Sequence, residues 1–508
     1  ILEELVHPPN EPTPSPATPP AVTQTTAVSA SPTPKPSASP TPTAPPTLIP
    51  TVSPVMTPAP AKTPTVTVKP TKTPAATATV PSPTPIMTDY TKQLVEQRRE
   101  LHQWPEEGWT EFWTTNYIVN KLRSWGYEVL LGTKIINPEQ VFGRNEKLVQ
   151  EGIKNALARG VSQSFIDETE GYTGCVALLD TGKEGPTTAF RFDIDCVCVN
   201  ETDNPEHKPN KEGFRSQHTG FMHACGHDSH ISIGLTLAHW IAERKDELKG
   251  KFKIVFQPAE EGVRGASAIA ASGIVDDADY FLGSHISFMA DSGEIVAAPY
   301  GLLCTSKFDV TFKGKPAHAG KEPNAGRNAL AAACNAVVQM MGIPRHGGGM
   351  TRINVGTLRA GEGRNVIPSS AHMALEVRGE TSSINDYMVE NVKNIVEGIA
   401  KGFDVSYEIS QMGAAVDFTN DKELSDMLIE VAKTVPGINN IRPDGNFGGS
   451  EDISVLGKRV QAHGGKAAFF ICGADRAAGH HQGSFDIDEG AFKQAFDMYV
   501  GMAKKLNG

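Results

Sequence analysis

The chain has no excess of basic residues and no basic cluster. Lys and Arg number 47 against 58 Asp and Glu, so the formal net charge is −11. An acidic chain without a basic patch offers little that would hold nucleic-acid phosphates or an anionic membrane surface. The sequence also lacks an apolar run of the length that a membrane-spanning helix needs. We therefore expect neither nucleic acid nor a membrane among its partners.

A serine-hydrolase motif is also missing. No G-x-S-x-G nucleophile elbow occurs anywhere in the sequence. His346 and the three glycines that follow it have the composition of a lipase oxyanion loop. Without the elbow, that segment predicts only a flexible loop, and acyl transfer through a serine nucleophile is not expected.

The first 86 residues contain no Gly, Cys, Phe or Trp, and they hold about two-thirds of the chain's 37 prolines. Such a segment cannot bury a hydrophobic core. Dense proline favours the extended polyproline II conformation, so we predict a solvated, semi-rigid linker without activity over residues 1–86. Its composition is similar to that of the Pro/Thr-rich linkers between modules of secreted bacterial proteins.

The cysteine content gives a different indication of the compartment. The chain has seven cysteines, an odd number, which is typical of a reducing cell interior. No signal peptide is recognisable, and Met87 follows the last proline of the tract as a natural initiator. We therefore expect a cytoplasmic enzyme core, with Ile1–Ile86 derived from a larger fusion or from an extracellular multimodular context.

The most informative motifs are MHACGHDSH, from Met222 to His230, and FKIVFQPAEEG, from Phe252 to Gly262. An isolated Cys-x-His pair is more often a buried cysteine beside a surface histidine. Here Cys225 and His227 are followed by the adjacent carboxylates of Glu260 and Glu261. Thiol, imidazole and carboxylate are the groups with which a metal-assisted hydrolase holds its ions and moves protons.

Polar residues recur where apolar runs end. Asp193 and Asp195 follow TTAFRF, His285 ends DYFLGSH, and His481 comes soon after AAFFICGAD. A helical apolar stripe over 231–248 lies between two of these runs, and alternating strands and helices predict a mostly parallel α/β sheet. In such a sheet, residues at the carboxyl ends of the strands converge on one crevice.

These motifs carry a family resemblance. The segments RRELHQWPEEGWTEFWTT, RFDIDCVCVNE, GFMHACGHDSH, FQPAEEGVRGA, KGKPAHAG, GRNVIP, GSED and HHQGSFDIDE follow one another in this order. Their order resembles that of the M20 metallopeptidase family, amidohydrolase branch. The resemblance runs from about Asp89 to the end of the chain.

The resemblance implies two divalent metal ions, zinc or manganese, with Glu260 as the general base. The ligands it implies are Cys225, His227, Glu261, His285 and His481. Asp195 matches a position that orients a ligand imidazole. Asp228 and His230 have two alternatives, ligand orientation or an ordinary place in the first turn of a helix. His223 and His480 are predicted to be neighbours of the ligands.

The region 306–419 has a different pattern. Four strand-like segments alternate with helix-like segments at 328–341 and 384–401 in a β-α-β-β-α-β order. This order is the ferredoxin-like α+β arrangement, and it resembles the lid or dimerisation domain inserted in M20 enzymes. We therefore expect a catalytic domain of residues 87–305 and 420–508, interrupted by a lid domain of residues 306–419.

The same resemblance implies substrate contacts from the lid. His318 would polarise the scissile carbonyl or stabilise the oxyanion, from its own subunit or across a dimer interface. Asn365 and Arg378 would hold a substrate carboxylate, although a lone Arg at a strand end is more often a surface ion-pair partner. A second carboxylate needs another cation, and the open alternatives are Lys321, Arg327 and Arg364.

The activity that the resemblance implies is metal-dependent hydrolysis of the amide bond of an N-acyl amino acid. The narrowest expectation that it implies is cleavage of p-aminobenzoyl-glutamate to p-aminobenzoate and glutamate. A broader N-acyl-amino-acid (hippurate-like) amidohydrolase is the alternative within the same mechanism, and a non-catalytic binding module or subunit on a linker is the alternative outside it. A homodimer, or a heterodimer with a homologous subunit, is the expected assembly.

Overall fold

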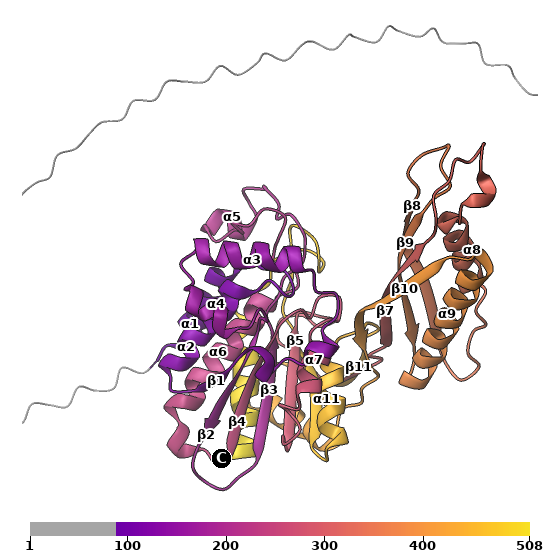
Figure 1. Ribbon diagram of the computed structural model, residues 1–508. Coiled ribbons are helices and arrows are strands. Elements are labelled where there is room, and N and C mark those ends of the chain that lie inside the picture. Colours follow the sequence, from indigo (N-terminus) through magenta and orange to yellow (C-terminus); the bar gives the residue numbers. More distant parts are fainter. Residues whose placement is uncertain (1–87) are drawn as a thin grey trace, which may run out of the picture. The chain divides into compact units, whose positions relative to one another are not determined.

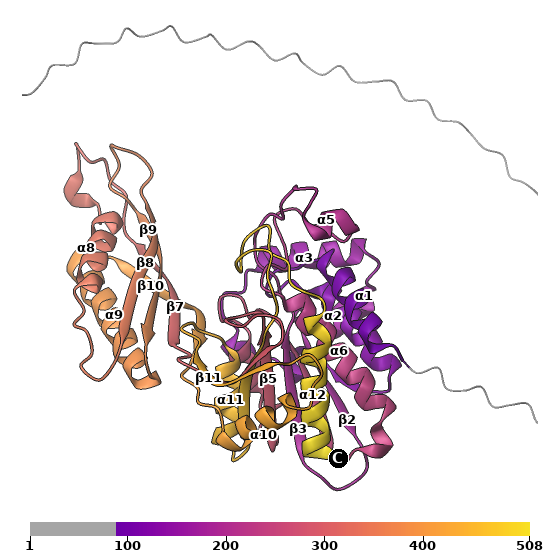
Figure 2. The same ribbon diagram turned by 180° about the vertical axis from the view of Figure 1, so that it is seen from behind.

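The computed structural model describes residues 88–508, which form two β-sheets with their covering helices (Figures 1 and 2). The linker predicted for residues 1–86 lies outside the described residues. Each sheet has its own cluster of buried apolar side chains, a large one around the first sheet and a smaller one beside the second. None of the helices in the described part combines the length and the apolar composition needed to cross a membrane.

The larger sheet has eight strands in the order β1-β2-β4-β3-β5-β12-β6-β11. The run β4-β3-β5-β12 is parallel, as is the pair β6-β11, whereas β1-β2, β2-β4 and β12-β6 are antiparallel. This confirms the predicted mostly parallel sheet. The strands are β1 (Glu128–Leu130), β2 (Cys175–Asp180), β3 (Thr187–Asp193), β4 (Lys251–Gln257), β5 (Tyr280–Ile286), β6 (Glu294–Tyr300), β11 (Asn440–Asn446) and β12 (Lys466–Cys472).

Helices cover both faces of this sheet. Successive side chains of a strand point to opposite faces. On β5 the hydroxyl of Ser284 contacts Tyr499 of α12, whereas Gly283 faces Ile453 of α11. The α-helices around the sheet are α1 (Tyr90–His102), α2 (Phe112–Ser124), α3 (Glu146–Ala158), α4 (Gln163–Glu168), α5 (Lys208–Glu212), α6 (His227–Glu243), α7 (Ala266–Ser272), α10 (Lys422–Ala432), α11 (Ile453–Ala462) and α12 (Ala491–Asn507).

The start of α6 differs from the sequence expectation of a helix over 231–248. The helix begins at His227, because Gly226 takes a left-handed backbone with φ of 96° and turns the chain into the helix. A side chain at Gly226 would also meet Ile286 at 2.9 Å. The predicted carboxyl end is replaced by a short 3₁₀ turn at Lys245–Glu247. Further 3₁₀ turns lie at Gly132–Lys134, Pro138–Gln140 and Pro323–Ala325.

The second sheet has four antiparallel strands in the order β10-β7-β9-β8. Its elements follow one another in the predicted order β-α-β-β-α-β, and α8 and α9 pack against it to enclose the smaller core. The elements are β7 (Cys304–Lys313), α8 (Ala329–Met341), β8 (Thr351–Ala360), β9 (Ser370–Gly379), α9 (Ser382–Phe403) and β10 (Ser406–Ala415). The domain boundaries and the lid role stay predictions.

Candidate metal centre

The larger sheet brings the predicted site residues together at one edge. His285 lies near the end of β5, and Glu260 and Glu261 follow the end of β4. Cys225 and His227 sit where α6 begins, and His481 comes from the loop after β12. Because β3, β4, β5 and β12 run parallel, the segments that leave their carboxyl ends meet on the same side.

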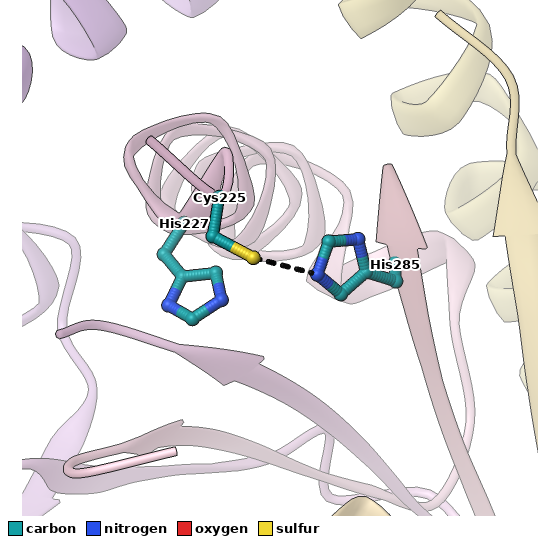
Figure 3. A group of neighbouring side chains, drawn as sticks. All are labelled: Cys225, His227 and His285. Atoms are coloured by element: carbon teal, nitrogen blue, oxygen red, sulfur yellow. Dashed lines mark hydrogen bonds between the residues drawn. The ribbon is translucent and has the colours of Figure 1, made fainter. Parts of the chain in front are cut away.

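The side chains of five predicted ligands approach one another closely. The thiol of Cys225 lies 3.4 Å from Nε2 of His285, and His227 points to the same space (Figure 3). Nε2 of His481 lies 3.3 Å from a carboxylate oxygen of Glu261. Three overlapping groups each keep their donor atoms within 4.8 Å of one another: Cys225 with His227 and His285, Cys225 with Glu261 and His481, and His227 with Glu260 and Glu261.

The donor atoms of this cluster fit a metal ion. Nδ1 of His227 donates to the backbone carbonyl of Asp195 at 2.9 Å, which leaves Nε2 as the atom that carries a lone pair. That Nε2 is buried and has no hydrogen-bond partner within residues 88–508. Buried polar atoms without partners are costly, and a divalent cation held by imidazole, thiolate and carboxylate would satisfy them.

Asp195 positions the loop that carries the two glutamates. Its carboxylate accepts the backbone N–H groups of Glu260 at 3.0 Å and Glu261 at 2.9 Å. Ala259 and Val263, on either side of the pair, have φ values of 52° and 59°. Non-glycine residues persist in this left-handed region only where the surroundings impose it. Asp195 therefore fixes both the imidazole of His227 and the strained turn after β4.

Glu260 lies among other carboxylates. It is buried, and burial together with Glu451 and Asp452 raises its pKa well above the usual range. Arg191 of β3 offsets part of this negative charge, because its guanidinium lies 3.1 Å from Glu451 and 2.9 Å from Asp452. Carboxylates packed this closely around one buried point are strongly stabilised by an added cation.

The other histidines around the centre differ in their contacts. Nδ1 of His230 lies 2.5 Å from Asp193, and its Nε2 accepts the backbone N–H of Ile286. Nδ1 of His480 approaches the thiol of Cys225 at 3.6 Å. His223 is buried, and neither of its ring nitrogens has a hydrogen-bond partner within the described chain.

Asp228 contacts α1 and does not face the cluster. Its carboxylate accepts Nε of Arg98 at 2.9 Å and lies 2.7 Å from Nδ1 of His102. The ring of His102 reaches on to Glu201, at 3.2 Å, an acidic residue for which the sequence suggests no role. This buried chain of charges ties the first turn of α6 to α1.

A cavity of about 210 Å³ opens over the cluster. Arg378, one of the predicted substrate-binding residues, lines it, and its Nε lies 3.1 Å from Glu376 on the same strand. Sequence reasoning did not identify four other lining residues, Phe288, Lys307, Phe447 and Glu451. Only Glu451 had a signal, because it belongs to the GSED motif. The others lie on a loop and on a strand whose alternation does not reveal what each face meets.

His318 and Asn365 do not line this cavity. Both are exposed, and they lie beside each other, where the N–H of Ala319 donates to the carbonyl of Asn365 at 2.9 Å. Thr305 of β7 lines the cavity, whereas His318 follows the far end of the same strand. At about 3.4 Å per residue, the part of β7 that follows Thr305 spans roughly 27 Å, so His318 lies far from Thr305 along the strand.

The three cations proposed for a second carboxylate are also absent from the cavity lining. Lys321 and Arg364 are exposed, and Arg327 pairs with Asp404. The geometry of a single chain therefore does not support the expectation that one of these three residues binds a second substrate carboxylate.

The chain is similar in sequence to known metallopeptidase-family hydrolases. The model of peptidase family M20/M25/M40 matches residues 189–505. A p-aminobenzoyl-glutamate hydrolase subunit homolog from Haemophilus influenzae is 58% identical over 415 residues, which cover 82% of this chain and 98% of that protein. Indole-3-acetyl-aspartic acid hydrolase from Enterobacter agglomerans is 40% identical over 412 residues, 80% of this chain and 94% of that one.

A solved structure agrees with these matches. The aminobenzoyl-glutamate utilization protein from Klebsiella pneumoniae superposes with a TM-score of 0.71 at 35% identity, covering 82% of this chain and 97% of that chain. The identity and the coverage extend over almost the whole length of these relatives. By sequence and by fold, the chain belongs to peptidase family M20/M25/M40 and is a hydrolase of that family.

Proposed function

We propose that this chain is a metal-dependent amidohydrolase that cleaves p-aminobenzoyl-glutamate to p-aminobenzoate and glutamate. The observation that carries the proposal is the cluster of five potential ligands around Cys225, with the buried carboxylate of Glu260 beside it and Arg378 in the same cavity. The names of the relatives support the substrate, since both describe an aromatic acyl group joined to a dicarboxylic amino acid.

The proposed cofactors are two divalent ions, zinc or manganese. Cys225, His227, Glu261, His285 and His481 would hold them. Thiolate and imidazole suit zinc, and the carboxylates of an open cleft suit manganese as well. When bound, such ions acidify the attacking water and polarise the amide carbonyl.

Glu260 is the proposed general base. A carboxylate beside the ligand cluster takes a proton from the attacking water as the C–O bond forms, and it returns that proton to the amide nitrogen as the C–N bond breaks. The hydrogen bond from its backbone N–H to Asp195 supports this role, because it holds the residue next to His227 and Glu261. Asp195 is thus a positioning residue for both the base and a ligand.

Arg378 is the proposed receptor of the α-carboxylate. A guanidinium can hold a carboxylate through two parallel hydrogen bonds, which fixes the orientation of the amino-acid part. In the free chain Glu376 lies 3.1 Å from Nε of Arg378. Substrate binding would exchange this partner for the substrate carboxylate.

An aromatic pair favours an aromatic acyl group. Phe288 and Phe447 both line the cavity, and their rings stack with centroids 4.5 Å apart and planes at 27°. Ser287 and Met289, on either side of Phe288, have φ values of 58° and 56°. Backbone strain of this kind persists at sites that need a fixed geometry. The two rings offer an apolar face of the size of a benzoyl ring.

The carbonyl groups beside Phe288 are held from outside the loop. Arg476 donates to the carbonyl of Ser287 at 2.5 Å, and Arg442 donates to the carbonyl of Met289 at 2.9 Å. Both bonds are charge-assisted and therefore stronger than neutral ones. They support a preorganised acyl pocket.

A second protomer is proposed to supply His318 and Asn365, which do not reach the cavity of their own chain. The lid domain of residues 306–419 has a surface that suits such a contact. Leu330, Val338 and Met341 are exposed on one side of α8, with Val338 at 72% of its full accessibility, and β8 is an edge strand. The partner is a second copy or a homologous chain, and the word "subunit" in the name of the Haemophilus relative supports either.

A broader amidohydrolase is the second candidate. The relative that is named for an indole-acetyl conjugate of aspartate favours it, because that acyl group is larger than a benzoyl group. Both candidates use the same centre and differ only in the acyl groups that the cavity accepts.

The test is metal content by elemental analysis, combined with release of glutamate from p-aminobenzoyl-glutamate by stripped protein reloaded with zinc or manganese. Metal-dependent release supports the proposal. Bound metal with release only from other N-acyl amino acids favours the broader amidohydrolase. Protein that neither binds metal nor releases an amino acid would be a binding module, and the proposal would fail.

A further inference from the structure

Lys307 occupies a position that the proposed function leaves without a role. It lies on β7, two residues after Thr305, so both side chains point to the same face of the second sheet. In the register of the antiparallel pair, Thr305 lies opposite Arg378 and Lys307 opposite Glu376. Cross-strand partners share a face, so Lys307 and Arg378 are diagonal neighbours. Both line the cavity over the ligand cluster.

The two cations differ in their pairing. Arg378 already has Glu376 as a partner at 3.1 Å. Lys307 is half-buried, yet its ammonium group makes no ion pair and no hydrogen bond with any residue in 88–508. Lys313, on the same strand, is more exposed and is paired with Glu408 at 2.8 Å. A half-buried cation without a partner at a cavity wall is free to form a charge-assisted hydrogen bond with an anionic group of a ligand.

The charges in the cavity indicate how many anionic groups can bind. Glu260, Glu261 and Glu451 belong to the floor beside the ligand cluster, and Lys307 and Arg378 are the two cations among the lining residues. Diagonal cross-strand positions lie about 7–8 Å apart, within reach of long side chains. Two flexible cations at this spacing match a ligand that carries two carboxylates a few bonds apart. A monocarboxylate held by Arg378 would leave Lys307 without a partner.

We propose that Lys307 binds the side-chain carboxylate of the substrate and makes this amidohydrolase selective for conjugates of dicarboxylic amino acids. The assignment rests on the proposed function, in which Arg378 takes the α-carboxylate. It replaces Lys321, Arg327 and Arg364, none of which lines the cavity. Lys307 is a specificity-determining residue and takes no part in the proton transfer.

The experiment compares p-aminobenzoyl-glutamate with p-aminobenzoyl-alanine in the metal-loaded full chain. A hydrogen bond to a charged group stabilises the bound glutamate conjugate. We therefore expect Lys307→Met to lower the ratio of kcat/KM for the glutamate conjugate to kcat/KM for the alanine conjugate by roughly 10- to 100-fold. The loss should appear mainly in KM, because the bond exists before and during the reaction. Lys313→Met is the matched control, and its ratio should equal that of the wild type. An unchanged ratio in Lys307→Met overturns the assignment.

Binding separates this inference from the proposed function. The two conjugates are titrated by calorimetry into metal-loaded Glu260→Gln protein, with and without Lys307→Met. A preference for the glutamate conjugate that disappears with Lys307→Met supports the assignment even if the wild type hydrolyses neither conjugate, in which case the proposed function alone fails. Equal binding of both conjugates before the substitution, or an undiminished preference after it, overturns the assignment whatever the wild type hydrolyses.

Discussion

The ends of the strands in the larger sheet and the strands of the smaller sheet contribute to the cavity in different ways. In the larger sheet, Cys225, His227, Glu261, His285 and His481 gather from four separate segments into overlapping groups within 4.8 Å. The smaller sheet provides Arg378 and Lys307 to the same cavity, while His318 and Asn365 stay exposed outside it. The five predicted ligands therefore meet within a single chain, whereas only one of the three predicted residues of the smaller sheet and its loops reaches the cavity.

The direction of the strands decides whether sequence motifs can predict which residues share a site. Residues that leave the carboxyl ends of parallel strands must converge, because the sheet brings those ends to one edge. In an antiparallel sheet, the segments that leave the strands lie at both ends of the sheet, and the side chains are divided between its two faces. Residues that belong to one family pattern therefore need not meet at one site. The first region should therefore determine metal binding and chemistry, and the second should determine substrate selection and dimer formation.

Loss of the proposed base should have the largest effect. Glu260→Gln removes the proton acceptor and leaves the ligand set intact, so we expect hydrolysis to fall by roughly 10²- to 10⁴-fold or more with metal content unchanged. Turnover and elemental analysis of the same sample measure both quantities. Full turnover in Glu260→Gln would contradict the assigned role.

Removal of a ligand should affect metal content first. His481→Ala takes away an imidazole that lies 3.3 Å from Glu261, and the variant should lose at least one ion together with its activity. The matched control is His463→Ala, an exposed histidine at the end of α11. Equal metal content in the two variants would remove His481 from the ligand set.

His318 tests whether the second region depends on a partner. His318→Ala should lower turnover by roughly 10²- to 10³-fold, the cost of losing one donor to an oxyanion, without loss of metal. Mixing His318→Ala with Glu260→Gln after dissociation should restore measurable activity, because a mixed dimer contains one intact site. A mixture as inactive as its components would place His318 outside a shared site.

The aromatic pair should have a smaller effect that depends on the substrate. Phe447→Ala removes one ring of the stack with Phe288, and we expect kcat/KM for p-aminobenzoyl-glutamate to fall roughly 2- to 10-fold relative to N-acetyl-glutamate. The exposed Tyr407→Ala is the control for loss of an aromatic side chain from elsewhere. The same loss for both substrates would contradict an acyl pocket formed by these rings.

Glu106 lies outside both regions and should alter stability alone. It is buried and accepts the N–H and hydroxyl of Thr114, and burial raises its pKa from 4.5 to about 7. A raised pKa means that the folded state keeps the proton, so its stabilising contribution is full below pH 4.5 and is lost as the pH rises through 7.

The expected loss from Glu106 is about 3 kcal/mol of unfolding free energy between these two pH values. Glu106→Gln cannot titrate, and it should flatten the fall in stability by that amount. Urea denaturation of both proteins at pH 5 and pH 8 measures the difference. Parallel pH profiles would show that another buried carboxyl group dominates.

The structure bears out some sequence predictions and corrects others for local reasons. The parallel sheet is predictable from apolar runs such as TTAFRFD and DYFLGSH. Short, near-continuous apolar runs of this kind are typical of parallel strands that are buried on both faces. The start of α6 differs from the prediction because the first turn, from His227 to His230, carries polar residues and precedes the apolar stripe. Lys307 and Phe288 were missed because strand alternation and loop composition do not reveal which cavity a side chain meets.

The sequence by itself determined the chemical groups and the order in which they occur. Cys225, His227, Glu260 and Glu261 are recognisable because their types and spacing match what a metal-assisted hydrolase requires. Only the tertiary structure decided which of the predicted residues share a cavity, since that depends on the direction of each strand and the face of each sheet. Arg378 and Lys307 therefore lie over the ligand cluster, whereas His318, with an equally clear motif, follows the far end of β7.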